Sequence, residues 1–181
     1  MKKISFNPFK KTFASRELER LEYFAKVGIF QGLSFDEISL FLPYLHERRY
    51  IKDEVVFFRG DPSLALYIIK SGTISLSLDY QDDLEELTKV GKGNSVGESC
   101  MLANTKRLLN AIVFSDTVEM YVIPQLNILE IFENNLSIKC KMMESLSILY
   151  HEYNKNLFEA YRKSLGFFHL PMVYEHRKLG L

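Results

Sequence analysis

The sequence has no net charge and few cysteines. Lys plus Arg and Asp plus Glu both total 23 in 181 residues, so the formal net charge is zero. Nucleic-acid-binding proteins usually carry an excess of positive charge, so this balance argues against DNA binding as the main activity. The two cysteines, Cys100 and Cys140, are too few for a disulfide framework and do not form a metal-ligand pair.

Long apolar runs are also missing. Runs such as Val55–Phe58 stay far below the roughly 20 residues of a membrane span, and the N-terminus lacks the signal-peptide core of roughly 7–15 apolar residues. We therefore expect a cytoplasmic protein with reduced thiols and no membrane contact. Hydrophobic residues nevertheless make up 47% of the chain and aromatic residues 13%, which is enough for a folded core. The length allows one domain, or one domain with a helical appendage.

Helical patterns lie at the two ends of the chain. Ser15 is a candidate cap for a helix over 16–26, and the capping box of Ser34 with Glu37 predicts a second helix that runs to about residue 47. Pro43 should kink or end that helix. After Pro124, a period of 3.6 predicts helices over 125–133 and 136–164.

The middle of the chain has a period of two, which is typical of half-buried strands. Thr73–Leu78 alternates most regularly, with one apolar and one hydroxylic face. Strands are predicted at Glu54–Phe58, Leu66–Lys70, Thr73–Leu78, Leu84–Val90, Ala111–Phe114 and Val118–Ile123. Residues 98–103 do not alternate and predict a short inserted helix. Together the pattern indicates a small antiparallel sandwich or barrel.

One segment carries chemical information, the glycine-rich stretch 90–98 followed by Arg107. Glycine lets a backbone approach a ligand closely, and the start of the next helix presents N–H groups that suit an anion. Arg107 can pair with a phosphate by a forked contact, and Glu98 can accept hydrogen bonds from a sugar hydroxyl. These groups describe a ribose phosphate site. By themselves they are also compatible with a plain ion pair between Glu98 and Arg107.

The chain resembles the cyclic nucleotide-binding domain family, which includes bacterial catabolite activator proteins and protein kinase A regulatory subunits. The resemblance runs from about Leu18 to Lys163 and rests on the order and spacing of several segments. These are Ile29–Ser34, Val55–Asp61, Leu66–Gly72, Val90–Glu98 and Asp116–Ile123, with an ungapped spacing from Arg107 to Asp116.

This resemblance implies an α+β fold, mainly β: an antiparallel, jelly-roll-like β-roll with N-terminal helices, a short phosphate-cassette helix and C-terminal helices. We expect an N-terminal extension at 1–14, the domain at 15–163 and a tail at 164–181. Within the domain, helices at 15–47 and 124–163 should flank a roll at 50–123.

By position in the family's motif, Gly97 and Glu98 would contact the ribose and Arg107 the cyclic phosphate. Backbone N–H groups near Ser99, Cys100 and Leu109 would complete the phosphate site. No catalytic, metal or cofactor site is expected, and we do not expect an enzyme.

The sequence departs from the family pattern beside the arginine. Leu108 and Leu109 stand where the family commonly has a small or hydroxylic residue and then alanine, so they would crowd or fill the pocket. Because Leu108 offers no hydroxyl to guanine, cyclic AMP is expected rather than cyclic GMP. The two leucines also support an alternative, a β-roll interaction module that has lost its nucleotide. Gly97, Glu98 and Arg107 oppose that alternative.

The expected role is a sensor that acts through an unidentified protein partner or through self-association. The helix over 136–163 would either form a homodimer seam or cover the roll of its own chain. A DNA-reading winged helix needs roughly 60 residues, and residues 164–181 are too few, so we expect no direct DNA binding.

Overall fold

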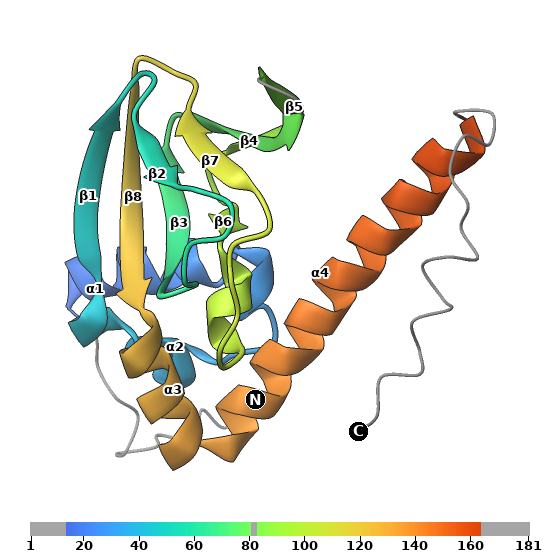
Figure 1. Ribbon diagram of the computed structural model, residues 1–181. Helices are drawn as coiled ribbons and strands as arrows, with labels where there is room; N and C mark the ends of the chain where they lie inside the picture. Colours follow the sequence, from blue (N-terminus) through green and yellow to red (C-terminus); the bar gives the residue numbers. More distant parts are fainter. Residues whose placement is uncertain (1–13, 81–82, 164–181) are drawn as a thin grey trace, which may run out of the picture. The chain divides into compact units, whose positions relative to one another are not determined.

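The strands form two antiparallel sheets of four strands each (Figure 1). The structure is a computed structural model that describes residues 14–80 and 83–163. One sheet has the order β1-β8-β3-β6 and the other β2-β7-β4-β5. The strands are β1 (His46–Ile51), β2 (Val55–Phe57), β3 (Ala65–Ser71), β4 (Thr73–Tyr80), β5 (Asp83–Gly91), β6 (Ser95–Val96), β7 (Asn110–Val113) and β8 (Thr117–Pro124).

The core of the roll lies between the two sheets. It is built by one face of each strand, because side chains alternate across a strand with a period of two. The core residues are Ile69, Ile74, Leu76, Val96, Ala111, Val113, Val118 and Met120, and they come from both sheets. Tyr67 and Phe57 pack against this cluster from its margin, where the ligand-site candidates also lie.

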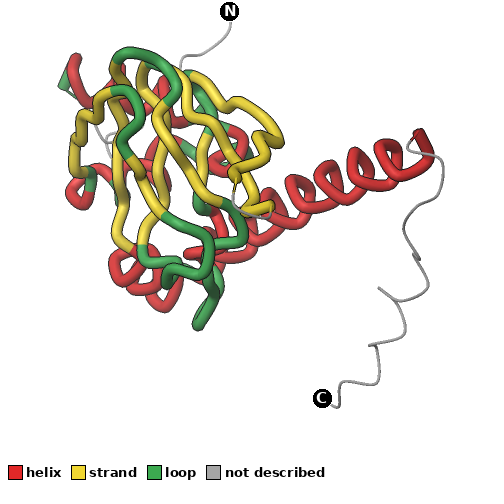
Figure 2. The backbone as a smooth tube through the Cα atoms, turned by 45° about the horizontal axis from the view of Figure 1, so that its top comes forward, coloured by secondary structure: helices red, strands yellow, loops and turns green. Residues whose placement is uncertain are grey.

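Helices lie around one end of the roll (Figures 1 and 2). They are α1 (Ser15–Phe24), α2 (Phe35–Ser39), α3 (Gln125–Asn134) and α4 (Leu136–Lys163), with short 3₁₀ helices η1 (Gly28–Phe30), η2 (Leu42–Tyr44) and η3 (Glu98–Met101). Phe24 joins this layer to the sheet, since its ring lies 5.1 Å from that of Phe30 and 5.4 Å from that of Tyr121 on β8. Edge and tilted ring contacts of this kind add to the apolar burial.

The structure confirms the antiparallel β-roll with helices at both ends. The capping box is present, because Ser34 Oγ accepts from the Glu37 N–H and the Glu37 carboxylate accepts from the Ser34 N–H. The second helix, however, ends at Ser39 instead of reaching residue 47. Pro43 sits in η2, and His46 already begins β1, so the prediction for 40–47 was wrong.

Two further boundaries differ from the expectation. Ala14, not Ser15, is the N-cap of α1; its side chain caps nothing, but its N–H donates to the Glu17 carboxylate at 3.0 Å. The inserted helix is a 3₁₀ turn over Glu98–Met101 and ends before residue 103. The predicted N-terminal extension, except for Ala14, and the tail at 164–181 lie outside the described residues.

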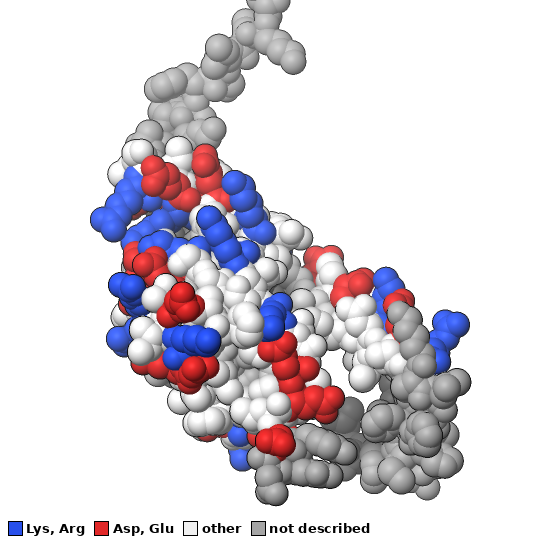
Figure 3. Space-filling model, turned by 90° about the horizontal axis from the view of Figure 1, so that it is seen from above, with Lys and Arg blue, Asp and Glu red and all other residues white. Residues whose placement is uncertain are grey.

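The chain divides into two units, Met1–Ser145 and Leu146–Leu181, so α4 contributes to both. The first unit holds the roll and the candidate site. In the second, Ile148, Tyr153, Leu157 and Phe158 are exposed on α4. Within the described ranges no helix has the length and apolarity of a membrane span. Basic and acidic side chains are interspersed on the face shown in Figure 3. That face is therefore neither predominantly positive nor predominantly negative.

Candidate functional site

The turn between β6 and η3 is built on Gly97. Its φ is +83°, a left-handed conformation that glycine adopts without strain. A Cβ at this position would overlap Nη1 of Arg107 and would lie 2.9 Å from its Cζ and 3.1 Å from the Ala65 carbonyl oxygen. Gly97 therefore provides both the backbone shape and the space that Arg107 fills.

Arg107 is held inside the roll by backbone oxygens. Only 4% of the residue is exposed. Its Nη1 donates to the Gly97 carbonyl at 2.9 Å, and its Nη2 donates to the Ala65 carbonyl at 2.7 Å. The side chain thus ties the turn before η3 to the start of β3.

The charge of Arg107 is only partly compensated. Its Cζ lies 4.2 Å from the ring centre of Phe57 and 5.6 Å from that of Tyr67, so two aromatic faces contact the guanidinium. Burial lowers the pKa of Arg107 from its ordinary value. Its Nε is buried and has no hydrogen-bond partner among the described residues. A buried cation in this condition favours an added anion.

Glu98 is the second buried charge of the turn. The residue is 8% exposed, and its Oε1 accepts from Ser95 Oγ at 2.6 Å. Burial raises the pKa of Glu98, although hydrogen bonds and the nearby charge of Arg107 act in the opposite direction. Within the described part of the chain, no ion pair of 4.0 Å or less joins Glu98 to Arg107. The simple ion-pair interpretation therefore does not describe this site.

Ser99 and Cys100 lie on η3, and some of their polar groups already form hydrogen bonds within the protein. Ser99 Oγ is 2.8 Å from Ser63 Oγ, and the Cys100 N–H donates to the Gly97 carbonyl at 3.1 Å. The Cys100 N–H is therefore already used by the turn. Burial raises the pKa of the Cys100 thiol to about 12, so this thiol stays protonated and inert.

The two leucines after Arg107 behave differently from the expectation of a crowded pocket. Leu108 is 73% exposed, so it does not fill the interior. Leu109 is partly buried and packs against the core of the roll. Both residues lie in the bend between Arg107 and the start of β7 at Asn110. Leu108 consequently does not occupy the interior in which Arg107 is buried.

Two residues that the sequence did not single out are connected to this turn. The Gln125 side-chain amide, at the start of α3, donates to the Cys100 carbonyl at 2.8 Å and to the Leu102 carbonyl at 3.2 Å. On the other side, the Tyr23 phenol of α1 donates to the Ile69 carbonyl and accepts from the Gly93 N–H at 3.2 Å. A helix before the roll and a helix after it therefore both contact the segment from Gly93 to Leu102.

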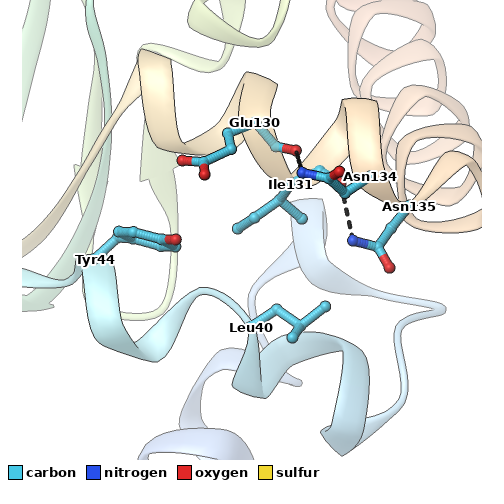
Figure 4. Close-up of a pocket in the computed structure, with 6 residues that line it drawn as sticks. All are labelled: Leu40, Tyr44, Glu130, Ile131, Asn134 and Asn135. Atoms are coloured by element: carbon cyan, nitrogen blue, oxygen red, sulfur yellow. Dashed lines mark hydrogen bonds between the residues drawn. The ribbon is translucent and has the colours of Figure 1, made fainter.

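A hollow lies between α2, η2 and the end of α3 and has a volume of about 160 Å³ (Figure 4). Leu40 and Ile131 face it, and the side chains of Asn134 and Asn135 bond back to the Glu130 and Ile131 carbonyls. Ligand sites usually measure roughly 300–1,000 Å³, so this hollow is too small for a nucleotide. No group of metal-binding side chains occurs in the described ranges.

Part of this chain is similar to known proteins. Residues 47–135 match the family model described as the cyclic nucleotide-binding domain. A cyclic AMP receptor protein from Thermus thermophilus is 32% identical over 90 residues, which cover 49% of this chain and 42% of that protein. The chain thus spans about two fifths of that relative's length.

Solved structures show the same fold at lower identity. A cyclic nucleotide-binding domain from Methylobacillus flagellatus superposes with a TM-score of 0.69 and 21% identity, over 83% of this chain and 85% of that one. The Thermus thermophilus catabolite activator protein gives a TM-score of 0.62 and 24% identity, over 74% of this chain and 62% of that one. These structures show the fold alone, and it is the match to the family model that assigns residues 47–135 to the cyclic nucleotide-binding domain family.

Proposed function

We propose that this chain binds a cyclic nucleotide, cyclic AMP in preference to cyclic GMP, and acts as a sensor. The observation that carries the proposal is Arg107, a buried cation whose Nε has no partner and which has no acidic group within 4.0 Å among the described residues. A cyclic phosphate supplies one negative charge and acceptor oxygens to such a guanidinium. Membership of the family supports this choice of anion.

The remaining contacts follow from the turn. The carboxylate of Glu98 and the backbone of Gly97 would contact the ribose, and backbone N–H groups near Ser99 and Leu109 would contact the phosphate. The Cys100 N–H would have to leave the Gly97 carbonyl first. Since Leu108 carries no hydroxyl and is exposed, we assign it no guanine contact, which leaves cyclic AMP as the preferred ligand.

The proposed signal is a shift between two states of the turn. Phosphate binding would redirect Arg107 from the Gly97 and Ala65 carbonyls, and this would loosen the turn from β3. Gln125 joins the far end of η3 to α3, so a movement of η3 would reach that helix. A ligand can bias the two states only by its difference in affinity for them. The output would be a change in a protein partner or in self-association through residues 136–163.

One observation favours an alternative, a nucleotide-independent interaction module. Both Nη groups of Arg107 already donate to backbone carbonyls, so the site is partly satisfied without a ligand. The two functions differ in one measurable property. A ligand that binds only the folded chain stabilises it by about 2.7 kcal/mol when present at 100 times its Kd.

The test is calorimetric titration and thermal unfolding with cyclic AMP and cyclic GMP. We expect saturable binding of cyclic AMP, tighter than that of cyclic GMP, and a loss of roughly tenfold or more in affinity for Arg107→Ala. Arg16→Ala is the matched control, because Arg16 is an exposed arginine of α1. Absence of stabilisation at millimolar ligand would contradict the sensor function, and unchanged affinity in Arg107→Ala would contradict the phosphate assignment.

A further inference from the structure

The hollow between α2, η2 and the end of α3 suits a ligand much smaller than a nucleotide (Figure 4). Its volume is about 160 Å³. A water molecule takes about 30 Å³ in the liquid, so the hollow has room for a chain of about five non-hydrogen atoms. Its lining residues are Leu40, Tyr44, Glu130, Ile131, Asn134 and Asn135, and all of them lie in the unit Met1–Ser145.

Two aliphatic side chains give the hollow an apolar wall. Leu40 is the C-cap of α2 and is 38% exposed, and Ile131 of α3 is 5% exposed. Figure 4 shows both side chains pointing into the space between α2 and α3. Because contact with them removes methylene groups from water, they favour a ligand that carries an alkyl chain.

The polar side chains of the hollow present oxygen atoms that can accept hydrogen bonds. Asn134 Nδ2 donates to the Glu130 carbonyl at 2.9 Å. Asn135 Nδ2 donates to the Ile131 carbonyl at 3.1 Å. Both amide nitrogens are thus used at the end of α3, and neither amide oxygen has a donor within the described parts of the chain. The Glu130 carboxylate and the Tyr44 hydroxyl likewise have no hydrogen-bond partner there.

The electrostatics of the hollow favour a cation. Glu130 carries a negative charge and forms no ion pair within residues 14–80 and 83–163. The hollow also lies at the C-terminal end of α3, where the helix dipole attracts positive charge. None of the six lining residues is basic, so the wall supplies no positive charge of its own.

We propose that this hollow binds a primary ammonium group on a short alkyl chain. An ammonium has three N–H donors and no acceptor, so it matches a wall that offers a carboxylate, a hydroxyl oxygen and amide oxygens. The alkyl chain packs against Leu40 and Ile131 while the charge is held by Glu130. Such a group occurs in free alkylamines and in the lysine side chains of other proteins, and the chemistry of the two is the same.

This site does not depend on cyclic nucleotide binding. The hollow shares no lining residue with the turn from Gly97 to Arg107. It joins α2 and η2 to the end of α3, so a bound ammonium holds these elements together. Hydrogen exchange of the amides in α3 should therefore slow when the ligand is present, whether or not the chain binds a nucleotide.

The experiment is an NMR titration of the full chain with n-butylamine at neutral pH, observed at the backbone amides of residues 40–44 and 130–135. We expect saturable shifts and a Kd of roughly 1–10 mM, because a ligand of about five non-hydrogen atoms makes few contacts. 1-Butanol has the same length without the charge and should bind roughly tenfold more weakly. Butyrate, which has the opposite charge, should not bind.

Nα-Acetyl-lysine methylamide distinguishes the two sources of the ammonium group. This probe carries the same ammonium on a side chain that is flanked by peptide groups. Tighter binding than that of n-butylamine assigns the site to a lysine side chain of a partner protein, and weaker binding assigns it to a free alkylamine.

Glu130→Gln removes the charge and keeps the size of the side chain. It should weaken n-butylamine binding roughly tenfold or more, and Tyr44→Phe should weaken it by a smaller factor. Glu133→Gln is the matched control, because Glu133 is exposed on the same helix and does not line the hollow. Unchanged affinity in Glu130→Gln, equal affinities for n-butylamine and 1-butanol, or no saturable shifts at these amides would overturn the proposal. Thermal unfolding of each variant shows that a lost affinity is not a lost fold.

Discussion

Arg107 occupies the space in which a side chain on Gly97 would lie. The glycine has a φ of +83°, its carbonyl accepts from Nη1 at 2.9 Å, and an added Cβ would overlap the same nitrogen. The two residues are ten positions apart in the chain. A side chain added at position 97 would displace the Arg107 guanidinium, and a movement of Arg107 would break its hydrogen bond to the Gly97 carbonyl. The turn and the buried cation therefore form one structural unit.

Gly97→Ala should destabilise the chain and displace Arg107. A left-handed conformation costs a non-glycine residue about 1–2 kcal/mol, and the overlap with Nη1 adds a steric cost. We expect a drop in the free energy of unfolding, measured with urea, together with weaker cyclic AMP binding.

Gly32→Ala separates these two costs. Gly32 has a φ of +86°, but nothing lies within 4 Å of the Cβ that it would gain. The Gly32→Ala variant should therefore lose only the stability that corresponds to the left-handed conformation, and its affinity for cyclic AMP should not change. If the two variants lose equal stability, the contact between Gly97 and Arg107 does not constrain the turn.

Glu98→Gln should change how stability depends on pH. Burial raises the pKa of Glu98 in the folded chain above its ordinary value of 4.5. Its contribution to stability is therefore fully present below about pH 4.5 and is lost as the pH rises through the folded pKa. Glutamine cannot ionise, so the stability of the variant relative to the parent should increase with pH across that window. Urea unfolding from pH 4 to 8 measures this difference, and a flat or falling difference contradicts the assignment.

The sequence predicts the strands whose faces differ in polarity and misses those whose faces do not. Thr73–Leu78 alternates because one of its faces is buried in the roll, and it lies within β4. His46–Ile51 carries charges on both faces of an exposed edge strand, so it gives no period of two. The apolar spacing of Ile38, Phe41 and Leu45 fits a continued helix instead. That spacing also fits η2 and its short connections, which Pro43 favours.

The position of the candidate site could be predicted, but its internal contacts could not. Glycine at 97 and arginine at 107 are local signals of a turn and a charge. Besides Gly97, the partners of Arg107 are Ala65, Phe57 and Tyr67, which come from distant segments that meet only in the folded roll. Hydrophobic periodicity contains no information about such pairings. The same applies to Tyr23, which reaches a turn 70 positions away.

Gln125→Leu should uncouple η3 from α3. Leucine keeps the size of the side chain but removes the two donors that bind the Cys100 and Leu102 carbonyls. The loss should be about 1–2 kcal/mol of stability, because each hydrogen bond contributes about 0.5–1.5 kcal/mol. Hydrogen exchange should show faster opening of α3 and a smaller effect of cyclic AMP on it. Unchanged exchange in both conditions would mean that this side chain does not connect the two helices.

Glu37 and Lys141 should be energetically coupled. The Lys141 ammonium donates to both Glu37 oxygens at 2.8 Å and so attaches the first part of α4 to α2. A double-mutant cycle with Glu37→Gln and Lys141→Met should give a coupling of about 0.5–1 kcal/mol, since both side chains are partly exposed.

The coupling between Glu37 and Lys141 should also depend on pH. Burial raises the pKa of Glu37, but hydrogen bonds from Lys141 and Ser34 outweigh it, so the pKa in the folded chain is lowered below 4.5. Its contribution is present above about pH 4.5 and is lost as the pH falls through the folded pKa. Repeating the cycle at a series of pH values from 7 downward tests this, and a coupling that does not weaken as the pH falls contradicts it.

The two cysteines should differ sharply in reactivity. Cys140 is exposed on α4, whereas Cys100 is buried on η3 with a pKa raised by burial to about 12. At pH 8 roughly one Cys100 in ten thousand is therefore a thiolate, the form that reacts. Titration of the folded chain with a disulfide reagent should give one fast thiol, and a second should appear only in urea. Cys140→Ser should abolish the fast phase, and a fast phase that remains in this variant would show that Cys100 is accessible and that the cassette opens readily.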